Sequence, residues 1–247
     1  MMKASTVPSR PEIHRRGSYG IDAPALLPIL ALLMASTVIS GIVSGMIWSF
    51  IGAAVIAVFV YLAYYVSRKG KFIVWTRLIG QLNLRGDERI LDIGCGRGAV
   101  LLIAAQYLTT GKAVGIDIWK RSDQSGNSIQ ATERNAKAEG VEDRVELRTA
   151  DMTSLPFQGD SFDLIVSNLA IHNVNSQKRD MAVDEAVRVL RSGGRLMIGD
   201  IMGTDQYARR LESLGMRNVN KQDLGWRMWW GGPWARTVLV SCVKPQT

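Results

Sequence analysis

One carboxylate and three glycines stand close together between an apolar run at 89–93 and a second one at 99–105. A strand, a glycine-rich turn and a helix in this order bring backbone N–H groups close to a bound ligand. The spacing is G-x-G-x-G, which differs from the G-x-G-x-x-G of dinucleotide sites. The carboxylate would repel a pyrophosphate and attract the cationic end of a methionine moiety. The candidate contact residues are Asp92, Gly94, Cys95, Gly96 and Gly98.

Further polar residues follow later apolar runs. Asp117 suits the hydroxyl groups of a ribose, and the apolar Ile118 beside it offers a surface for a base. Asp151 suits an exocyclic amine and is followed by Met152, and Asn168 ends a fourth apolar run. We expect these residues to meet a ligand that lies across the ends of the strands.

Beyond Trp75 short apolar runs alternate with longer amphipathic ones, which is typical of a parallel sheet covered by helices. Strands are expected over 89–93, 113–117, 144–149, 162–167, 195–200, 217–223 and 236–243. Helices are expected over 97–108, 125–139, 177–191 and 204–214. The sequence therefore predicts an α/β domain over residues 75–247.

Residues 75–245 resemble the class I S-adenosylmethionine-dependent methyltransferases, and among them the ubiquinone/menaquinone C-methyltransferase group. The resemblance rests on the segment 91–98, on Asp117, on Asp151-Met152 and on the turn at 190–196. It implies a Rossmann-like, seven-stranded, mostly parallel sheet sandwiched by helices, with a reversed final strand. The implied cofactor is S-adenosylmethionine.

The resemblance also implies a role for each polar residue. Asp92, with Gly94 and Gly96, would hold the methionine end of the cofactor, and Asp117 would hold the ribose hydroxyls. Asp151 would bind the adenine amine, with Met152 packed on the ring. Asn168 would close the site beside the sulfonium.

A general base is needed only where the acceptor must lose a proton before it is methylated. His172 lies just past the fourth strand, and imidazole is the side chain most often used as a general base near neutral pH, so it is our candidate for a catalytic base. The alternative is that His172 only packs or caps a helix. Asp200, at the end of the fifth strand, is an alternative group on the acceptor side, although we expect it to cap the following helix.

No side chain from Ala23 to Val66 is charged. As a helix this stretch would be about 66 Å long, roughly twice the thickness of the bilayer hydrocarbon. Two glycines within residues 40–45 suggest a turn, so we predict a transmembrane hairpin over 23–67 with helices at 24–40 and 46–66. A re-entrant or in-plane hairpin is the alternative. The basic segment 1–22 is expected to be flexible.

The basic residues flank this apolar stretch, whereas the middle of the chain is slightly acidic. Arginines and lysines before and after the hairpin place both of its ends on the cytoplasmic side, at the inner membrane if the protein is bacterial. No basic track for nucleic acid is expected. The two cysteines, Cys95 and Cys242, are too few for a disulfide framework, and no metal site is predicted.

Four of the seven tryptophans stand within residues 226–236. Tryptophan and arginine together favour a membrane interface and also line apolar pockets. We predict that this loop faces the bilayer and forms the mouth of the acceptor site; a packed loop between the last two strands is the alternative.

Together these patterns predict a membrane-anchored enzyme that moves a methyl group from S-adenosylmethionine to a small, hydrophobic, membrane-derived acceptor such as a lipid, a quinone or a thiol. The partners would be this acceptor and the bilayer. A nicotinamide-dependent oxidoreductase and a membrane-tethered binding protein without turnover are the alternatives.

Overall fold

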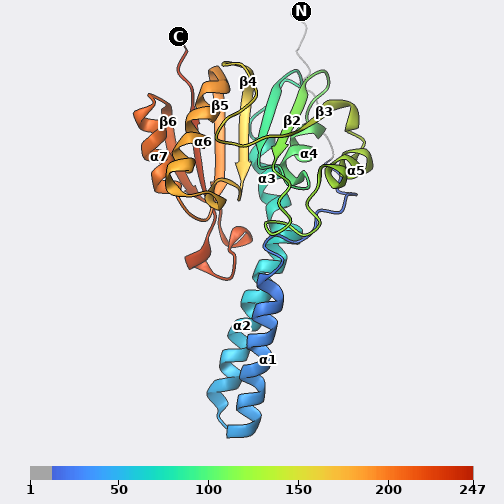
Figure 1. Cartoon of the computed structure of the whole chain (residues 1–247), viewed down its shortest axis with the longest axis vertical. Coiled ribbons are helices and arrows are strands. Elements are labelled where there is room, and N and C mark those ends of the chain that lie inside the picture. Colours follow the sequence, from blue (N-terminus) through green and yellow to red (C-terminus); the bar gives the residue numbers. More distant parts are fainter. Residues whose placement is uncertain (1–12, 247) are drawn as a thin grey trace, which may run out of the picture.

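The computed structural model describes residues 13–246, and a long helical hairpin leaves one end of an α/β domain (Figure 1). The predicted alternation of strands and helices is confirmed. The strands are β1 (Arg89–Ile93), β2 (Lys112–Asp117), β3 (Val145–Thr149), β4 (Phe162–Asn168), β5 (Leu190–Asp200), β6 (Arg217–Asp223) and β7 (Val238–Val243). The helices that pack on them are α3 (Lys71–Gly80), α4 (Ala99–Gln106), α5 (Ile129–Glu139), α6 (Ser176–Val189) and α7 (Thr204–Ser213).

The strands form one seven-stranded sheet in the order β3-β2-β1-β4-β5-β7-β6. Strands β1 to β5 pair in parallel, and β7 lies antiparallel to both β5 and β6. This is the mostly parallel, Rossmann-like sheet that the sequence predicts. The strand order reverses at β1, with β2 on one side and β4 on the other, and ligands of open α/β sheets bind beyond the carboxyl ends of strands at such a point.

Two apolar cores lie on the two faces of the sheet, because successive side chains of a strand point to opposite sides. Ile90 belongs to the core that also contains Trp75 of α3 and Leu101 of α4. Its neighbour Leu91 belongs to the core that contains residues of α6 and α7. Helix α4 is buried from Ala99 to Ala105, which explains its continuously apolar sequence.

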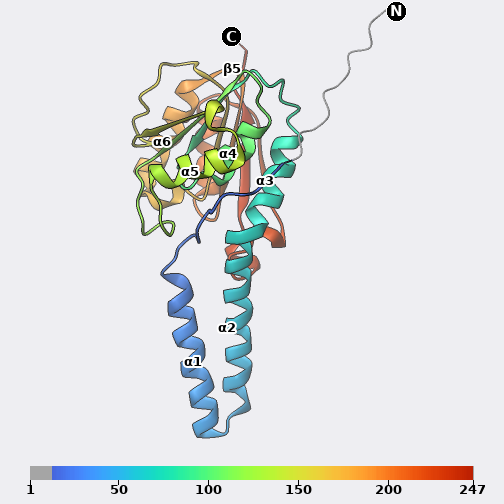
Figure 2. The same ribbon diagram turned by 90° about the vertical axis from the view of Figure 1, so that its right-hand side faces the viewer.

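The hairpin consists of α1 (Leu26–Ser44) and α2 (Ile47–Tyr65), which lie side by side (Figure 2). Both are long and apolar enough to cross a membrane, judged by length and composition alone. In the most apolar window of the first span, only 6% of the residues are buried inside the protein. The corresponding share for the second span is 11%. The protein itself therefore leaves most apolar residues of the hairpin partly or fully exposed.

Helix α1 is longer than the predicted range 24–40. It passes through Gly41 and ends at Gly45, whose left-handed φ of 67° allows its N–H to bond to the Gly41 carbonyl. Gly41 instead permits close packing of the two helices, since a Cβ there would lie 3.0 Å from the ring of Phe50.

Helix α2 (Ile47–Tyr65) agrees with the predicted range 46–66, but the chain stays helical beyond it. A single π-helical turn at Val66–Gly70 follows α2 and leads directly into α3. The charged Arg68 and Lys69 suggest a break, but the apolar spacing continues beyond them, and Trp75 and Ile79 are fully buried in the domain. No linker therefore separates the predicted hairpin at 23–67 from the domain.

The N-terminal segment from residue 13 lies against the domain, although flexibility was expected over 1–22. Tyr19 is buried, and its hydroxyl donates to Glu139 at 2.7 Å. The same carboxylate oxygen accepts bonds from the backbone N–H groups of Arg16 and Gly17. Residues 1–12 of that prediction lie outside the described residues.

Candidate active site

The glycine-rich turn between β1 and α4 takes a backbone path that larger residues rarely adopt. Gly94, Gly96 and Gly98 have φ values of 73°, 51° and 84°. A Cβ at Gly94 would lie 2.2 Å from the Cβ of Ala170. The N–H groups of Gly94 and Cys95 donate to the Ile116 carbonyl at 2.9 and 3.0 Å. These contacts fix the turn against β2 and leave room for a ligand only because side chains are absent.

Asp92 is an unusual buried carboxylate at the end of β1. Its residue is 2% exposed, and Oδ2 has no hydrogen-bond partner among the described residues. Burial raises the pKa of Asp92 to about 8, and the nearby Asp117 adds to this rise. A cationic ligand would satisfy this oxygen and favour its ionised form.

Asp117, at the end of β2, faces the same space but is well supplied with donors. Its Oδ2 accepts from the Gly96 N–H at 2.8 Å, and Oδ1 accepts from the Trp119 N–H at 2.5 Å and from Asn127 at 3.3 Å. Burial still raises the pKa of Asp117 above its usual value. The carboxylate is thus held in one orientation, in which its remaining lone pairs can accept hydroxyl groups.

A cleft joins these groups across the ends of β1, β2 and β4. Eight of the predicted contact residues line it, namely Asp92, Gly94, Cys95, Gly96, Asp117, Ile118, Met152 and Asn168. Gly98, Asp151 and His172 do not line it. The spacing of the glycine-rich turn and of the later carboxylates therefore predicts most of one continuous site.

The residues outside the cleft have other local roles. Gly98 begins α4, and a Cβ there would lie 3.0 Å from both Leu102 and Thr132. Asp151 is exposed, and its Oδ1 accepts bonds from the N–H and hydroxyl of Thr153, which lower its pKa. Because the Asp151 carboxylate bonds to Thr153, the cleft surface at this strand end comes from Ala150 and Met152 instead.

The cleft also contains residues that the sequence analysis missed. Asp22 and Lys71 line it. The sequence indicated only that basic residues flank a membrane segment in this part of the chain. Gln124 lines it too, and its Oε1 accepts the Arg97 N–H at 2.7 Å. No motif marks these residues, since they reach the cleft only through the tertiary fold.

Asn168 is positioned by the helix that continues the hairpin. Its Oδ1 accepts the indole N–H of Trp75 at 2.8 Å. The neighbouring Ser167 donates its hydroxyl to the Ile93 carbonyl at 2.9 Å, which ties the end of β4 to the end of β1. Helix α3 thus helps to shape the wall of the cleft.

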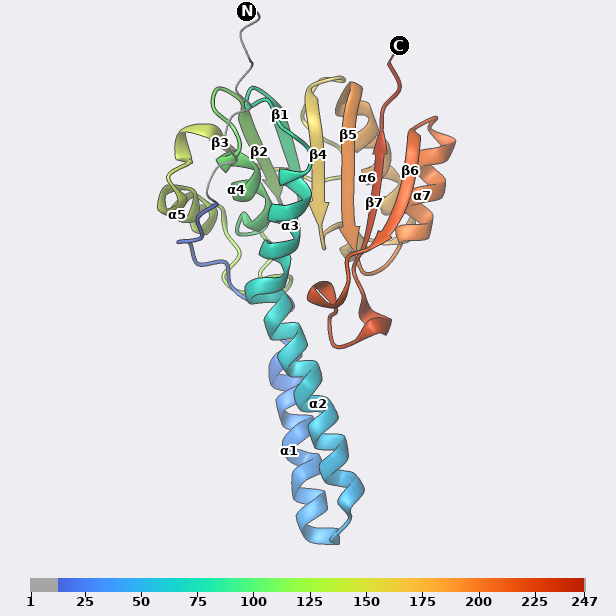
Figure 3. The same cartoon turned by 180° about the vertical axis from the view of Figure 1, so that it is seen from behind.

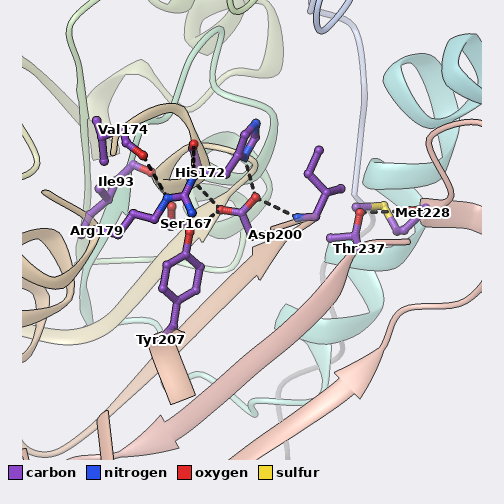
Figure 4. A network of polar contacts seen from close by, with 10 residues as sticks. Ile93, Ser167, His172, Val174, Arg179, Asp200, Tyr207, Met228 and Thr237 are labelled. Atoms are coloured by element: carbon purple, nitrogen blue, oxygen red, sulfur yellow. Dashed lines mark hydrogen bonds and ion pairs between the residues drawn. The ribbon is translucent and has the colours of Figure 1, made fainter. Parts of the chain in front are cut away.

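His172 and Asp200 form a close pair next to the cleft (Figure 4). The Nδ1 atom of His172 lies 2.5 Å from Oδ1 of Asp200, and its backbone N–H donates to Oδ2 at 3.0 Å. Asp200 is fully buried and also accepts from the Ile201 N–H at 2.8 Å and the Tyr207 hydroxyl at 3.3 Å. The other ring nitrogen of His172 points away from Asp200.

This pair corrects the expectation for Asp200. Helix α7 begins at Thr204 with Gly203 as its N-cap, so Asp200 does not cap it. Asp200 instead fixes the tautomer and orientation of the His172 ring, as a carboxylate does beside a histidine base. His172 is absent from the lining of the cleft, but Ala170 and Asn173 on either side of it are present there.

The tryptophan-rich loop at 226–236 packs on the hairpin helix. Trp226 stacks on Tyr65 with ring centroids 5.3 Å apart, and Trp234 meets Phe59 edge-on at 5.2 Å. Trp234 remains 71% exposed. None of the residues 226–236 lines the cleft, so its predicted role as the mouth of the site remains a prediction.

Comparison with known proteins agrees with the fold. Residues 91–198 match the family model described as a methyltransferase domain. The chain is 35% identical to the 27-O-demethylrifamycin SV methyltransferase of Amycolatopsis mediterranei over 147 residues, which cover 56% of this chain and 50% of that protein. It is 32% identical to the demethylmenaquinone methyltransferase of Symbiobacterium thermophilum over 134 residues, which cover 53% and 50%. The chain thus spans about half the length of these curated relatives.

Solved structures share the fold at lower identity. A geranyl diphosphate methyltransferase in complex with SAM has a TM-score of 0.57 and 17% identity, with 74% of this chain and 90% of that chain covered. The [4+2]-cyclase SpnF has a TM-score of 0.57 and 20% identity, with 70% and 80% covered. These likenesses show the fold alone, and the second protein is named for a different reaction.

The matched segment, the sheet and the cleft agree with the predicted class I S-adenosylmethionine-dependent methyltransferase domain. S-adenosylmethionine is the cofactor that this domain takes. The residues fit it, since the unpaired Asp92 suits the cationic methionine end and the oriented Asp117 suits a ribose.

Proposed function

We propose that the protein is a membrane-anchored methyltransferase that acts on a small hydrophobic acceptor taken from the bilayer. One observation carries this proposal: the cleft is lined by Asp22 and Lys71, which stand at the two ends of the hairpin. The arrowheads of β4 and β5 also point toward the hairpin (Figure 3). The end of the domain that holds the cofactor would therefore face the membrane surface.

The anchoring part of the proposal rests on the surface of the hairpin. Val43 is 82% exposed and Trp48 is 71% exposed, and such a continuous apolar surface is unfavourable in water. Both ends of the hairpin return to the same domain, so that domain lies on one side of the bilayer. The basic residues near these ends favour the cytoplasmic side.

The acceptor part rests on the apolar residues near the hairpin. Trp226 and Trp234 contact α2, and Trp226 is 47% exposed. Their position suits the interface between headgroups and acyl chains. The relatives named for rifamycin, menaquinone and geranyl diphosphate substrates also methylate small molecules. A lipid or an isoprenoid quinone fits this setting best.

For the chemistry, the cofactor supplies an activated methyl group on its sulfonium sulfur. Asp92 at the end of β1 and Asp117 at the end of β2 would hold the cofactor and orient it in the cleft. His172, oriented by Asp200, would take the proton of an acceptor hydroxyl or activated C–H through its free ring nitrogen. When bound, the cofactor would give up its methyl group to the acceptor and leave as a neutral thioether.

The cofactor assignment is tested by titrating the full-length protein in nanodiscs with S-adenosylmethionine, S-adenosylhomocysteine and NADH. We expect the first two to bind, and Asp117→Ala to weaken both by more than tenfold because the ribose loses its acceptor. Binding of NADH alone would favour an oxidoreductase, and binding of none would favour a tethered protein without this cofactor.

The topology is tested with a single introduced thiol, because both native cysteines are buried. Ser44→Cys, at the turn of the hairpin, should react with a membrane-impermeant reagent only from outside the cell. A matched Ser213→Cys at the end of α7 should react only after lysis. Labelling of both variants from the same side would contradict a hairpin that spans the bilayer.

A further inference from the structure

Lys71 is a buried cation in the wall of the cofactor cleft. Its residue is 2% exposed, and it begins α3 directly after the π-helical turn at Val66–Gly70. A π turn adds a residue to the helix and so rotates the following side chains, which is why such turns often mark functional sites. Here the first residue after the turn, Lys71, lines the cleft.

A chain of hydrogen bonds fixes the position of this lysine. Its Nζ donates to Oδ2 of Asp22 at 2.7 Å, and Oδ1 of Asp22 accepts from Gln124 at 2.7 Å. Gln124 in turn accepts the Arg97 N–H of the glycine-rich turn at 2.7 Å. The network therefore connects both ends of the hairpin to the turn that holds the cofactor.

The charges of the cleft suit a ligand with both signs. The lining contains two lysines, of which the Lys120 side chain is 60% exposed and faces Asp123 at 4.0 Å. Lys71 is thus the buried positive group, and Oδ2 of the buried Asp92 carboxyl, which a cationic ligand would ionise, lacks a hydrogen-bond partner among the described residues. The methionine end of the cofactor carries an ammonium and a carboxylate, which these two groups complement.

We propose that Lys71 binds the carboxylate of the cofactor's methionine end, so that the membrane hairpin itself completes the cofactor site. This inference rests on the proposed function, because it takes S-adenosylmethionine as the ligand. Asp22 is then a positioning residue that holds Lys71 in place. The ligand favours the arrangement in which Lys71 faces the cleft. Cofactor binding and the folded π turn before Lys71 therefore stabilise each other.

The test compares two ligands that differ at the methionine end. S-adenosylhomocysteine carries the carboxylate, whereas 5′-methylthioadenosine has the same nucleoside and sulfur without it. In nanodiscs, Lys71→Met should weaken S-adenosylhomocysteine binding by about tenfold or more and leave 5′-methylthioadenosine within about twofold. Lys71→Arg, which keeps the charge, should restore most of the lost affinity.

Lys69→Met is the matched control, because Lys69 lies on the same π turn and is exposed. It should bind both ligands like the unchanged protein. If Lys71→Met weakens both ligands equally, or weakens neither, the assignment of Lys71 is overturned. The cofactor assignment still stands in that case, provided that the unchanged protein binds S-adenosylhomocysteine. Failure of the unchanged protein to bind S-adenosylhomocysteine would overturn both proposals.

Discussion

The two sides of the cofactor cleft are built in different ways. On the side of β1 and β2, backbone turns and a few carboxylates close in sequence form the surface, as in the Gly96 N–H bond to Asp117. On the side of the hairpin, side chains from distant segments form it, as in the Lys71 pair with Asp22. The first side follows from local spacing, whereas the second depends on how the hairpin joins the domain.

This contrast shows why the two sides should respond differently to mutation. A backbone turn fails when any side chain is added, because no rotamer can relieve the clash. A side-chain network fails only where a charge or hydrogen bond is lost, and the fold remains. The following predictions run from the largest expected effect to the smallest.

Gly94→Ala should abolish detectable cofactor binding. The new Cβ would meet Ala170 at 2.2 Å, and the residue would remain at a φ of +73°. Gly140→Ala is the matched control, since Gly140 has a φ of +67° but nothing within 4 Å of the added Cβ. It should destabilise the protein by about 1 kcal/mol from backbone strain alone and preserve binding. Titration calorimetry and thermal unfolding separate the two effects, and equal binding by both variants would contradict the account.

Asp200→Asn should lower kcat by about a hundredfold or more for an acceptor that loses a proton, with cofactor affinity unchanged. The amide holds the His172 ring less well and no longer stabilises its protonated form. A positioning role also predicts an altered pH profile of kcat, which a purely structural role would not produce. Asp184→Asn, which affects the exposed pair with Arg210, is the control and should leave kcat unchanged.

Cofactor affinity should rise with pH until the Asp92 carboxyl is ionised. Its pKa is raised to about 8 by burial, so the free protein holds this group protonated at neutral pH. Binding of a cationic ligand favours the carboxylate and releases a proton, so affinity should rise by up to about tenfold per pH unit below this value and then level off. Calorimetry across this range should show a flat profile for Asp92→Asn, and a flat profile in the unchanged protein would contradict the assignment.

The same raised pKa has the opposite effect on the ligand-free fold. A group whose folded-state pKa lies above its unfolded value stabilises the fold most at low pH and loses this contribution as pH rises through the folded pKa. The unliganded protein should therefore lose stability between about pH 4 and pH 8 from this group. Thermal stabilisation by the cofactor should grow over the same range.

Particular residues show which features the sequence can predict. The strands and most of the predicted residues that line the cleft follow from apolar periodicity and glycine spacing, which are local. The continuation of α2 through Lys69 into α3 was missed because charged residues there resemble a membrane boundary. Asp22 was missed and Asp200 was misjudged because their partners, Lys71 and His172, lie 49 and 28 positions away. Long-range pairs of this kind carry no signature in one sequence.

Methyl transfer within a single bilayer tests the central claim most directly. The protein in nanodiscs made with bacterial lipid extract would be incubated with S-adenosylmethionine labelled in the methyl group. The account predicts label in the organic-extractable fraction, reduced by Asp200→Asn and absent with Gly94→Ala. Label found only in the aqueous fraction, or no transfer despite cofactor binding, would contradict a methyltransferase that draws its acceptor from the membrane.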